Sequence, residues 1–118
     1  MLENKNIIIT GAGSGIGRAT SILAAGYGAN VVCVDLNPCV EETVQEIKAG
    51  NGNAVAQIAD VSREDDVQHY IQICIDTFGS LHGIYANAGV SGGGKPMLDL
   101  TVEDWHRTLS VNTLGVYL

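Results

Sequence analysis

Basic residues, aromatic residues and long apolar runs are all scarce in this sequence. Only 6 of the 118 residues are Lys or Arg, against 13 Asp and Glu, which gives a formal net charge of -7. Nucleic acids are bound by clustered Lys and Arg, and this sequence has no such cluster. No apolar run approaches the roughly 20 residues that span a bilayer, and no basic amphipathic face suits a membrane surface. We therefore expect neither a nucleic acid nor a membrane as a partner.

Cysteine and histidine are also few, and their spacing argues against disulfides and metal sites. Cys33, Cys39 and Cys74 are odd in number and form no Cys-x-x-Cys pair. The three histidines lie far apart and lack the spacing of metal ligands. The first residues lack the basic start and the long apolar stretch of a signal peptide. Together these absences predict a reduced, cytoplasmic protein without a metal site.

The sequence does contain a regular alternation of strands and helices. Short β-branched or apolar runs predict four strands, at residues 6–10, 31–34, 54–59 and 82–86. Helical spacing of apolar residues predicts four helices, at residues 16–27, 38–49, about 63–78, and from 102 onward. Because parallel neighbours need crossover connections, this alternation predicts an α/β fold of the Rossmann type. We expect an incomplete doubly wound parallel sheet of about four strands, order 3-2-1-4, with helices on both faces.

Three of the predicted helices carry a start signal. Asn37 precedes a proline, which suits a cap and the first turn of the second helix. Ser62 with Asp65, and Thr101 with Asp104, have the spacing of capping boxes. We therefore expect side-chain caps on the second, third and fourth helices, and a loop between residues 87 and 96.

Four glycines crowd the turn between the first strand and the first helix, in the stretch TGAGSGIG at residues 10–17. A helix N-terminus attracts phosphate through its free N–H groups, and glycine lets the backbone come close and take positive φ. The spacing fits neither G-x-G-x-x-G nor the P-loop, and reads T-G-x-x-x-G-x-G. We expect a pyrophosphate site here, with the Ser14 hydroxyl as a further donor. The alternative is a purely structural turn.

Asp35 ends the second strand, 18 residues after Gly17. A carboxylate at this place accepts hydrogen bonds from the adenosine ribose hydroxyls of NAD and repels the 2′-phosphate of NADP. Leu36 follows, so no base stands beside the carboxylate, and we expect Arg18 to point outward from the first helix. The pattern predicts NAD as the cofactor. The alternative is that Asp35 is only a turn residue.

The motif T-G-x-x-x-G-x-G resembles that of the classical short-chain dehydrogenase/reductase family, and further matches follow in the family's order. Asp60-Val61 closes the third strand, where family members hold the adenine ring. Asn87-Ala88-Gly89 is similar to the family's N-N-A-G, with Ala86 in place of the first Asn. That first Asn helps to tie the sheet in the family, so we expect the tie to be made otherwise here. Asn112 matches the helix Asn of the family's catalytic proton relay.

The resemblance covers residues 6–118 and implies an NAD-dependent oxidoreductase that interconverts an alcohol and a ketone by hydride transfer. It also implies a homo-oligomer, either a dimer or a tetramer. It gives cofactor-binding roles to Gly11, Ser14, Gly15, Ile16, Gly17, Asp35, Leu36, Asp60, Val61, Asn87, Ala88 and Gly89. It gives a catalytic role to Asn112. The alternative for Asn112 is structural, because it shares an apolar helical face with Trp105, Leu109 and Val116, where a buried Asn can serve the backbone alone.

One part of the family's catalytic machinery does not occur in this sequence. The family needs a Ser and a Tyr-x-x-x-Lys pair, whose Lys lowers the pKa of the Tyr, and no Tyr-x-x-x-Lys is present. We expect residues 1–118 to be the N-terminal portion of a dinucleotide-binding domain, truncated before the catalytic helix and inactive alone. The alternative is a non-catalytic NAD-binding module, or a stub that binds a partner through its last helix and open sheet edge.

Overall fold

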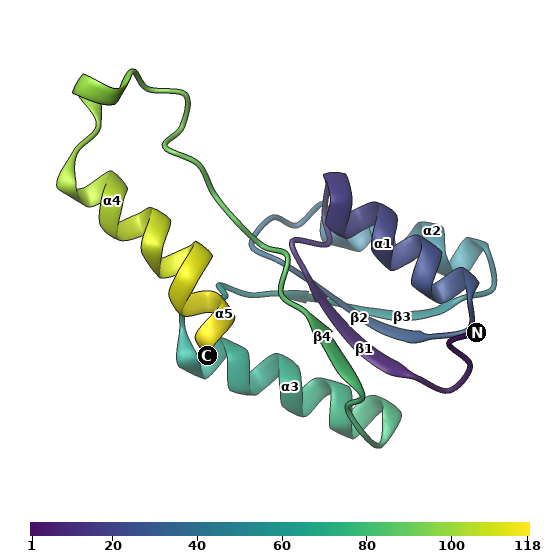
Figure 1. Cartoon of the computed structure of the whole chain (residues 1–118). Helices are drawn as coiled ribbons and strands as arrows, with labels where there is room; N and C mark the ends of the chain where they lie inside the picture. The colour runs from purple at the N-terminus through teal and green to yellow at the C-terminus, as the bar shows by residue number, and fades with distance from the viewer.

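Four parallel strands form one sheet in the computed structural model, which describes residues 1–118 (Figure 1). The strands are β1 (Asn6–Thr10), β2 (Asn30–Asp35), β3 (Asn53–Ile58) and β4 (Gly83–Tyr85). Their order is β3-β2-β1-β4, and every neighbouring pair is parallel. The predicted doubly wound fold is confirmed, and no strand end differs from its predicted position by more than one residue.

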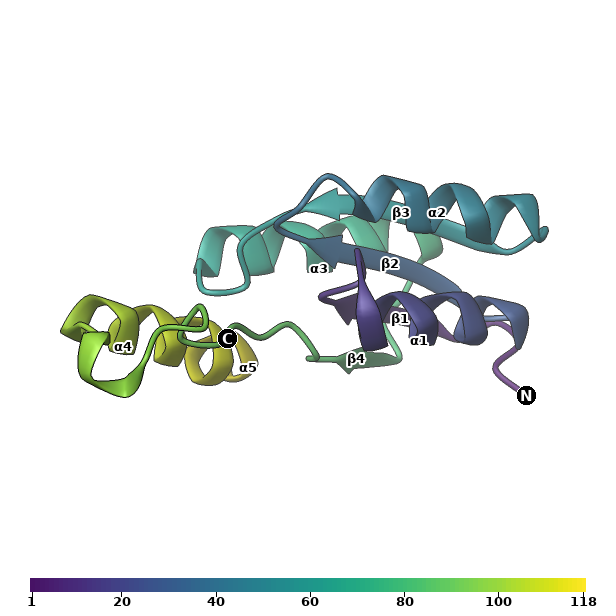
Figure 2. The same cartoon turned by 90° about the horizontal axis from the view of Figure 1, so that it is seen from above.

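Helices cover both faces of the sheet. α1 (Gly15–Gly26) and α2 (Val40–Ala49) lie on one face, and α3 (Glu64–Phe78) lies on the other (Figures 1 and 2). Successive side chains of β1 and β2 point to opposite faces and enter two separate cores: Ile9, Val31 and Cys33 on the side of α1 and α2, and Ile8, Val32 and Val34 on the side of α3. Each fully buried Val or Ile stabilises the fold by about 1.5–3 kcal/mol.

The apolar face predicted for α3 is confirmed. Val67, Tyr70 and Cys74 are buried against the sheet, at the helical spacing that the sequence shows. The helix ends at Gly79, whose φ of 87° is the left-handed conformation that glycine adopts without strain. The chain then turns directly into β4.

A row of asparagines ties the amino ends of the strands together. Asn6, Asn30 and Asn53 lie in register on β1, β2 and β3. The Asn53 amide donates to Asn30 Oδ1, and the Asn30 amide donates to Asn6 Oδ1, each at 2.8 Å. The Asn6 amide donates in turn to the carbonyls of Phe78 and Ser80. This row links the amino ends of β1, β2 and β3, at the end of the sheet opposite the carboxyl ends of the strands.

The second helix starts later than predicted. α2 begins at Val40 rather than at Pro38. The Asn37 side chain accepts a hydrogen bond from the Cys39 N–H, and the Asn37 N–H donates to Asp35 Oδ1, both at 2.9 Å. These two local hydrogen bonds hold residues 35–39 in turns, so the regular helix forms only afterwards.

The capping box predicted at Ser62 and Asp65 is wrong. α3 begins at Glu64 after Arg63, and no side chain caps it. The Ser62 hydroxyl instead donates to the carboxylate of Asp60 at 2.6 Å. A charge-assisted hydrogen bond of this kind is stronger than one to a backbone N–H, which explains why the hydroxyl leaves the helix end.

Residues 86–118 project beyond the sheet as an arm, and the molecule is 48 Å long and 25 × 23 Å across (Figures 1 and 2). The arm contains a short 3-10 turn η1 (Met97–Asp99), α4 (Val102–Leu109), a π-helical turn η2 (Ser110–Leu114) and α5 (Gly115–Tyr117). The capping box of Thr101 and Asp104 is confirmed. None of the helices combines the length and the apolar composition that a membrane span requires.

The apolar helical face predicted for this arm is wrong in two respects. The π-helical turn interrupts the α-helical register between Leu109 and Val116. The side chains are also not buried: Trp105 is 64% exposed, and no residue of α4 is buried. The spacing of apolar residues gives no indication of this wider turn. A π-helical turn contains one more residue than an α-helical turn, and no residue type in this segment marks it.

Candidate functional site

The carboxyl ends of the strands open into one cavity of about 380 Å³. Its volume lies in the range of small-molecule sites, and its place outside the carboxyl edge of a doubly wound sheet is the usual one for a ligand. Five chain segments line it: the β1–α1, β2–α2 and β3–α3 turns, the segment after β4, and η2. The lining residues are Gly11, Ser14, Gly15, Ile16, Asp35, Leu36, Ala59, Asp60, Val61, Asn87, Ala88, Gly89, Val90 and Val111.

The glycine turn leads from β1 into the N-terminus of α1. Gly11 and Gly15 have φ values of 67° and 53°, which only glycine adopts without strain. Ser14 is the N-cap of α1, yet its exposed side chain makes no cap hydrogen bond. Its hydroxyl and the free N–H groups of the first helical turn are therefore available to an anionic ligand.

Gly17 lies outside the cavity lining and has a different place from the other glycines. It is buried where α1 packs on β1, and a Cβ there would overlap the carbonyl oxygen of Gly11. The same Cβ would lie 2.7 Å from the Asn87 amide nitrogen. Gly17 thus permits the close approach of helix and strand rather than forming part of the cavity wall.

Asp35 is held rigidly at the cavity. Its Oδ2 accepts from the Gly13 N–H at 2.8 Å, and its Oδ1 accepts from the Asn37 N–H at 2.9 Å. Each carboxylate oxygen can accept two hydrogen bonds, so both retain a free lone pair. Asp35 can therefore stabilise the turn and still accept hydrogen bonds from a ligand.

No positive charge lines the cavity, whereas two carboxylates do, those of Asp35 and Asp60. The Arg18 side chain forms an ion pair with Glu46 on α2, as expected for an outward-pointing residue. All three cysteines are free, and burial raises the pKa of the Cys33 thiol to about 11. No group of three His, Cys, Asp or Glu side chains is placed to hold a metal ion.

Thr10 connects the ends of β1 and β4. Its hydroxyl accepts hydrogen bonds from the Asn87 and Ala88 N–H groups, both at 3.0 Å. The Asn87 amide also donates to the Thr10 carbonyl at 3.1 Å. With Ala86 in place of an asparagine, these bonds supply the tie that the sequence left open. Thr10 opens the glycine motif, but the motif alone gives no indication of this role.

Asn112 lies in the π-helical turn and clamps the segment after β4. Its Oδ1 accepts from the Val90 N–H and its amide donates to the Val90 carbonyl, both at 2.8 Å. The side chain is exposed and does not line the cavity, whereas its neighbour Val111 and its partner Val90 do. Ala59, Val90 and Val111 were not predicted as site residues, because only the fold brings these apolar side chains to the cavity.

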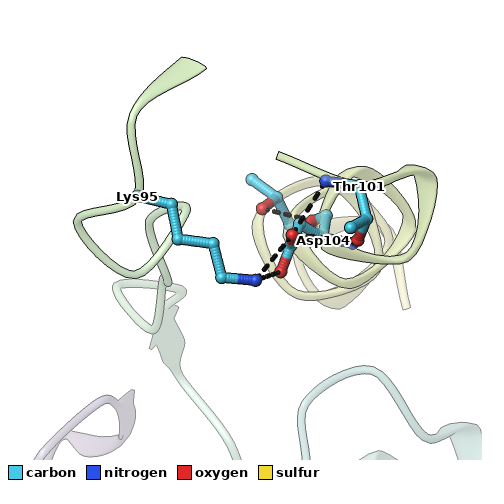
Figure 3. A network of polar contacts seen from close by, with 4 residues as sticks. Lys95, Thr101 and Asp104 are labelled. Atoms are coloured by element: carbon cyan, nitrogen blue, oxygen red, sulfur yellow. Dashed lines mark hydrogen bonds and ion pairs between the residues drawn. The ribbon is translucent and has the colours of Figure 1, made fainter. Parts of the chain in front are cut away.

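A second polar anchor fastens the following loop to α4 (Figure 3). The Lys95 ammonium donates to both carboxylate oxygens of Asp104, at 2.9 and 2.8 Å. This contact, with the two hydrogen bonds from Thr101, lowers the pKa of Asp104 to about 2. Beside the anchor lies a second hollow of about 540 Å³ between the loop and α4, lined by Met97, Leu100 and Trp105 among others.

Comparison with known proteins identifies relatives along the whole chain. The family model for short chain dehydrogenase matches residues 5–118. The chain is 38% identical over 116 residues to cyclohexanol dehydrogenase of Acinetobacter sp. (strain SE19), covering 98% of this chain and 46% of that protein. It is 36% identical over 117 residues to 2,5-dichloro-2,5-cyclohexadiene-1,4-diol dehydrogenase of Sphingobium indicum, covering 99% and 46%. The chain thus spans about half the length of the curated relatives it matches.

Solved structures share the fold. A 3-ketoacyl-(acyl-carrier-protein) reductase from Brucella melitensis, complexed with NADH, superimposes with a TM-score of 0.91 at 36% identity, covering 100% of this chain and 48% of that one. A short chain dehydrogenase/reductase from Burkholderia phymatum, in complex with NAD, gives a TM-score of 0.92 at 32% identity, covering 98% and 41%.

Proposed function

The chain belongs to the short-chain dehydrogenase family, and from that premise we propose that residues 1–118 form the NAD-binding domain portion of an oxidoreductase. The natural protein would interconvert an alcohol and a ketone. The observation that carries the proposal is the cavity itself: one hollow brings together the glycine turn, the free N-terminus of α1 and the fixed carboxylate of Asp35.

The glycine turn packs closely on its neighbours, because a Cβ at Gly13 would lie 2.6 Å from Cys39 Sγ and one at Gly11 would lie 2.9 Å from the Asn87 amide nitrogen. Gly15 lines the cavity, and a Cβ there would meet no protein atom within 4 Å, so the lack of a side chain leaves this space open to a pyrophosphate. Ser14 and the first N–H groups of α1 would hold the pyrophosphate, and Asp60 with Val61 would hold the adenine. Asn87, Ala88 and Gly89 would border the nicotinamide.

The charges of the cavity favour NAD over NADP. Asp35 offers two carboxylate oxygens, each with a free lone pair, to the hydroxyls of the adenosine ribose. The added phosphate of NADP would face this carboxylate, and no Lys or Arg lines the cavity to compensate. Arg18 does not line the cavity and forms an ion pair with Glu46. The relatives complexed with NAD and NADH support the same assignment.

The chemistry follows from the bound group and from the residues around it. When bound, NAD accepts a hydride from an alcohol carbon, and NADH returns one to a ketone. Within this chain, Asn112 fixes Val90 and thereby the wall of the cavity. Its part in a proton relay stays a prediction. Since the chain has no Tyr-x-x-x-Lys, we propose that residues 1–118 alone bind NAD without turnover.

The substrate class that we propose is a cyclic secondary alcohol and its ketone. The names of two relatives, cyclohexanol dehydrogenase and 2,5-dichloro-2,5-cyclohexadiene-1,4-diol dehydrogenase, both refer to alcohols on six-membered carbon rings. The second hollow offers such a ring apolar contacts with Met97, Leu100, Val102 and Trp105. We further propose a cytoplasmic homo-oligomer as the natural form.

The test is an assay of NADH formation by the natural full-length protein with cyclohexanol and NAD, together with NAD titration of the Asp35→Ala variant. We expect turnover with NAD, and a loss of NAD affinity in the variant of about 1.5–3 kcal/mol for each charge-assisted hydrogen bond removed. NAD binding without turnover on any alcohol would favour the non-catalytic module. Unchanged NAD affinity in Asp35→Ala would refute the assignment of this residue.

A further inference from the structure

The β3–α3 turn, residues Asp60 to Ser62, is fixed by hydrogen bonds at both of its ends. The Ser62 N–H and hydroxyl both donate to Asp60 Oδ1, at 2.9 and 2.6 Å. The Asp60 N–H donates to Asp66 Oδ2 at 2.8 Å. Asp60 lines the cavity, whereas Asp66 lies in the first turn of α3 and does not. Asp66 therefore acts on the cavity only through the backbone of Asp60.

The other side of the turn is closed by Gly115. A Cβ at this position would lie 2.8 Å from Val61 Cγ2 and 3.2 Å from the Val61 carbonyl oxygen. The turn therefore cannot shift toward α5 without displacing that helix. The hydrogen bond to Asp66 and the close contact with Gly115 thus constrain the Asp60–Ser62 turn from two sides.

One acceptor of this turn is left free. Asp60 Oδ1 already accepts two hydrogen bonds from Ser62, and no protein group donates to Oδ2. No buried side-chain oxygen or nitrogen in this protein lacks a partner, so Oδ2 is accessible to solvent. A carboxylate oxygen accepts a hydrogen bond from an amino group and repels a carbonyl oxygen. This acceptor thus distinguishes a 6-aminopurine from a 6-oxopurine.

We propose that Asp66 is a positioning residue for recognition of the purine amino group, because it fixes the backbone that presents Asp60 Oδ2. The inference rests on the proposed NAD function and extends its specificity to a residue outside the cavity. Arg63 lies beside this arrangement, with its Nε 3.7 Å from Asp66 Oδ1.

The test compares NAD with its hypoxanthine analogue, in which a carbonyl replaces the 6-amino group of the adenine. Binding of both to the natural full-length protein is measured by isothermal titration calorimetry. We expect the unchanged protein to bind NAD about tenfold more tightly than the analogue, the size of one charge-assisted hydrogen bond. Asp66→Ala should weaken NAD about three- to tenfold and leave the analogue nearly unchanged. Asp66→Asn keeps an acceptor for the Asp60 N–H and should retain most of the discrimination.

Asp65→Ala is the matched control, because Asp65 is an exposed carboxylate of the same helical turn without a hydrogen-bond partner. It should leave the ratio of the two affinities unchanged. A loss of both affinities by the same factor in Asp66→Ala, or an unchanged ratio, would overturn the proposal. If Asp66→Ala does not fold, Asp66→Asn provides the test: it keeps an acceptor for the Asp60 N–H and should retain the preference for NAD, so a loss of that preference would overturn the proposal.

Two outcomes separate this inference from the proposed function. If the unchanged protein binds neither dinucleotide, the NAD function fails and the role of Asp66 fails with it. If it binds NAD and the hypoxanthine analogue equally, NAD binding stands and only the role of Asp66 is refuted.

Discussion

The sheet with its three helices and the arm that follows it are held together by different forces. The strands and α1–α3 bury their apolar side chains, and every buried residue of the protein lies at or before Cys74. The arm has no buried residue. Apart from Leu118, which packs against the core, and Gly115, which lies against Val61, it is held by polar contacts: Asn112 on Val90, and Lys95 and Thr101 on Asp104. The cavity borders both regions, so one of its walls is rigid and the other is held by a few hydrogen bonds.

The contact of α1 with β1 should be the most sensitive point of the rigid region. Gly17→Val would place a side chain on the carbonyl of Gly11 and force helix and strand apart. We expect a loss of more than about 4 kcal/mol in the free energy of unfolding, measured in a urea titration followed by circular dichroism. Gly26→Ala is the control, because no atom lies within 4 Å of a Cβ there. A Gly17→Val protein as stable as this control would refute the packing described.

The difference in burial predicts a large difference between two apolar truncations. Ile8 is 0% exposed in the sheet, and Ile8→Ala should cost about 2–5 kcal/mol through lost transfer energy and an internal cavity. Trp105 is 64% exposed on α4, and Trp105→Ala should change the free energy of unfolding by less than about 0.5 kcal/mol. Equal losses in the two variants would show that the arm is packed as firmly as the sheet.

The Asn112 clamp should matter locally rather than globally. Asn112→Ala removes both hydrogen bonds to Val90, and we expect the Val90 amide to exchange its hydrogen about tenfold faster. The amide of Val32 in the central strand should keep its rate. Thr113→Ala changes an exposed neighbour that makes no side-chain hydrogen bond and serves as control. An unaltered rate at Val90 would mean that this clamp does not hold the loop.

The Lys95–Asp104 anchor should give the smallest effect and should depend on pH. The folded-state pKa of Asp104 is lowered to about 2 from its ordinary 3.8, so the anchor stabilises the arm above that ordinary value. The contribution falls away as the pH drops through about 2. Trp105 fluorescence should therefore change near pH 2, and Lys95→Met should move the change upward toward 3.8. If the pH midpoint of the fluorescence change is the same in Lys95→Met, the contact with Lys95 does not lower the pKa of Asp104.

Apolar patterning made the sheet predictable from the sequence. Val31 to Val34 form a continuous apolar run because β2 is covered on both faces, and such a run identifies an interior parallel strand. The glycine turn was predictable for a similar reason, because positive φ at Gly11 and Gly15 restricts these positions to glycine.

The features that the sequence did not predict depend on contacts between distant segments. The row of Asn6, Asn30 and Asn53 requires the strand register, which no local pattern contains. Ser62 has a local capping signal, yet the carboxylate of Asp60 is the stronger acceptor and takes its hydroxyl. The π-helical turn at Ser110–Leu114 accompanies the pairing of Asn112 with Val90, 22 residues earlier in the chain.

Titration of the natural full-length protein with NAD and with NADP, followed by calorimetry, tests the central claim most directly. We expect NAD to bind, and NADP to bind at least about tenfold more weakly, because its 2′-phosphate would face Asp35 and no Lys or Arg lines the cavity. Equal affinity for the two dinucleotides, or no binding of NAD, would contradict it.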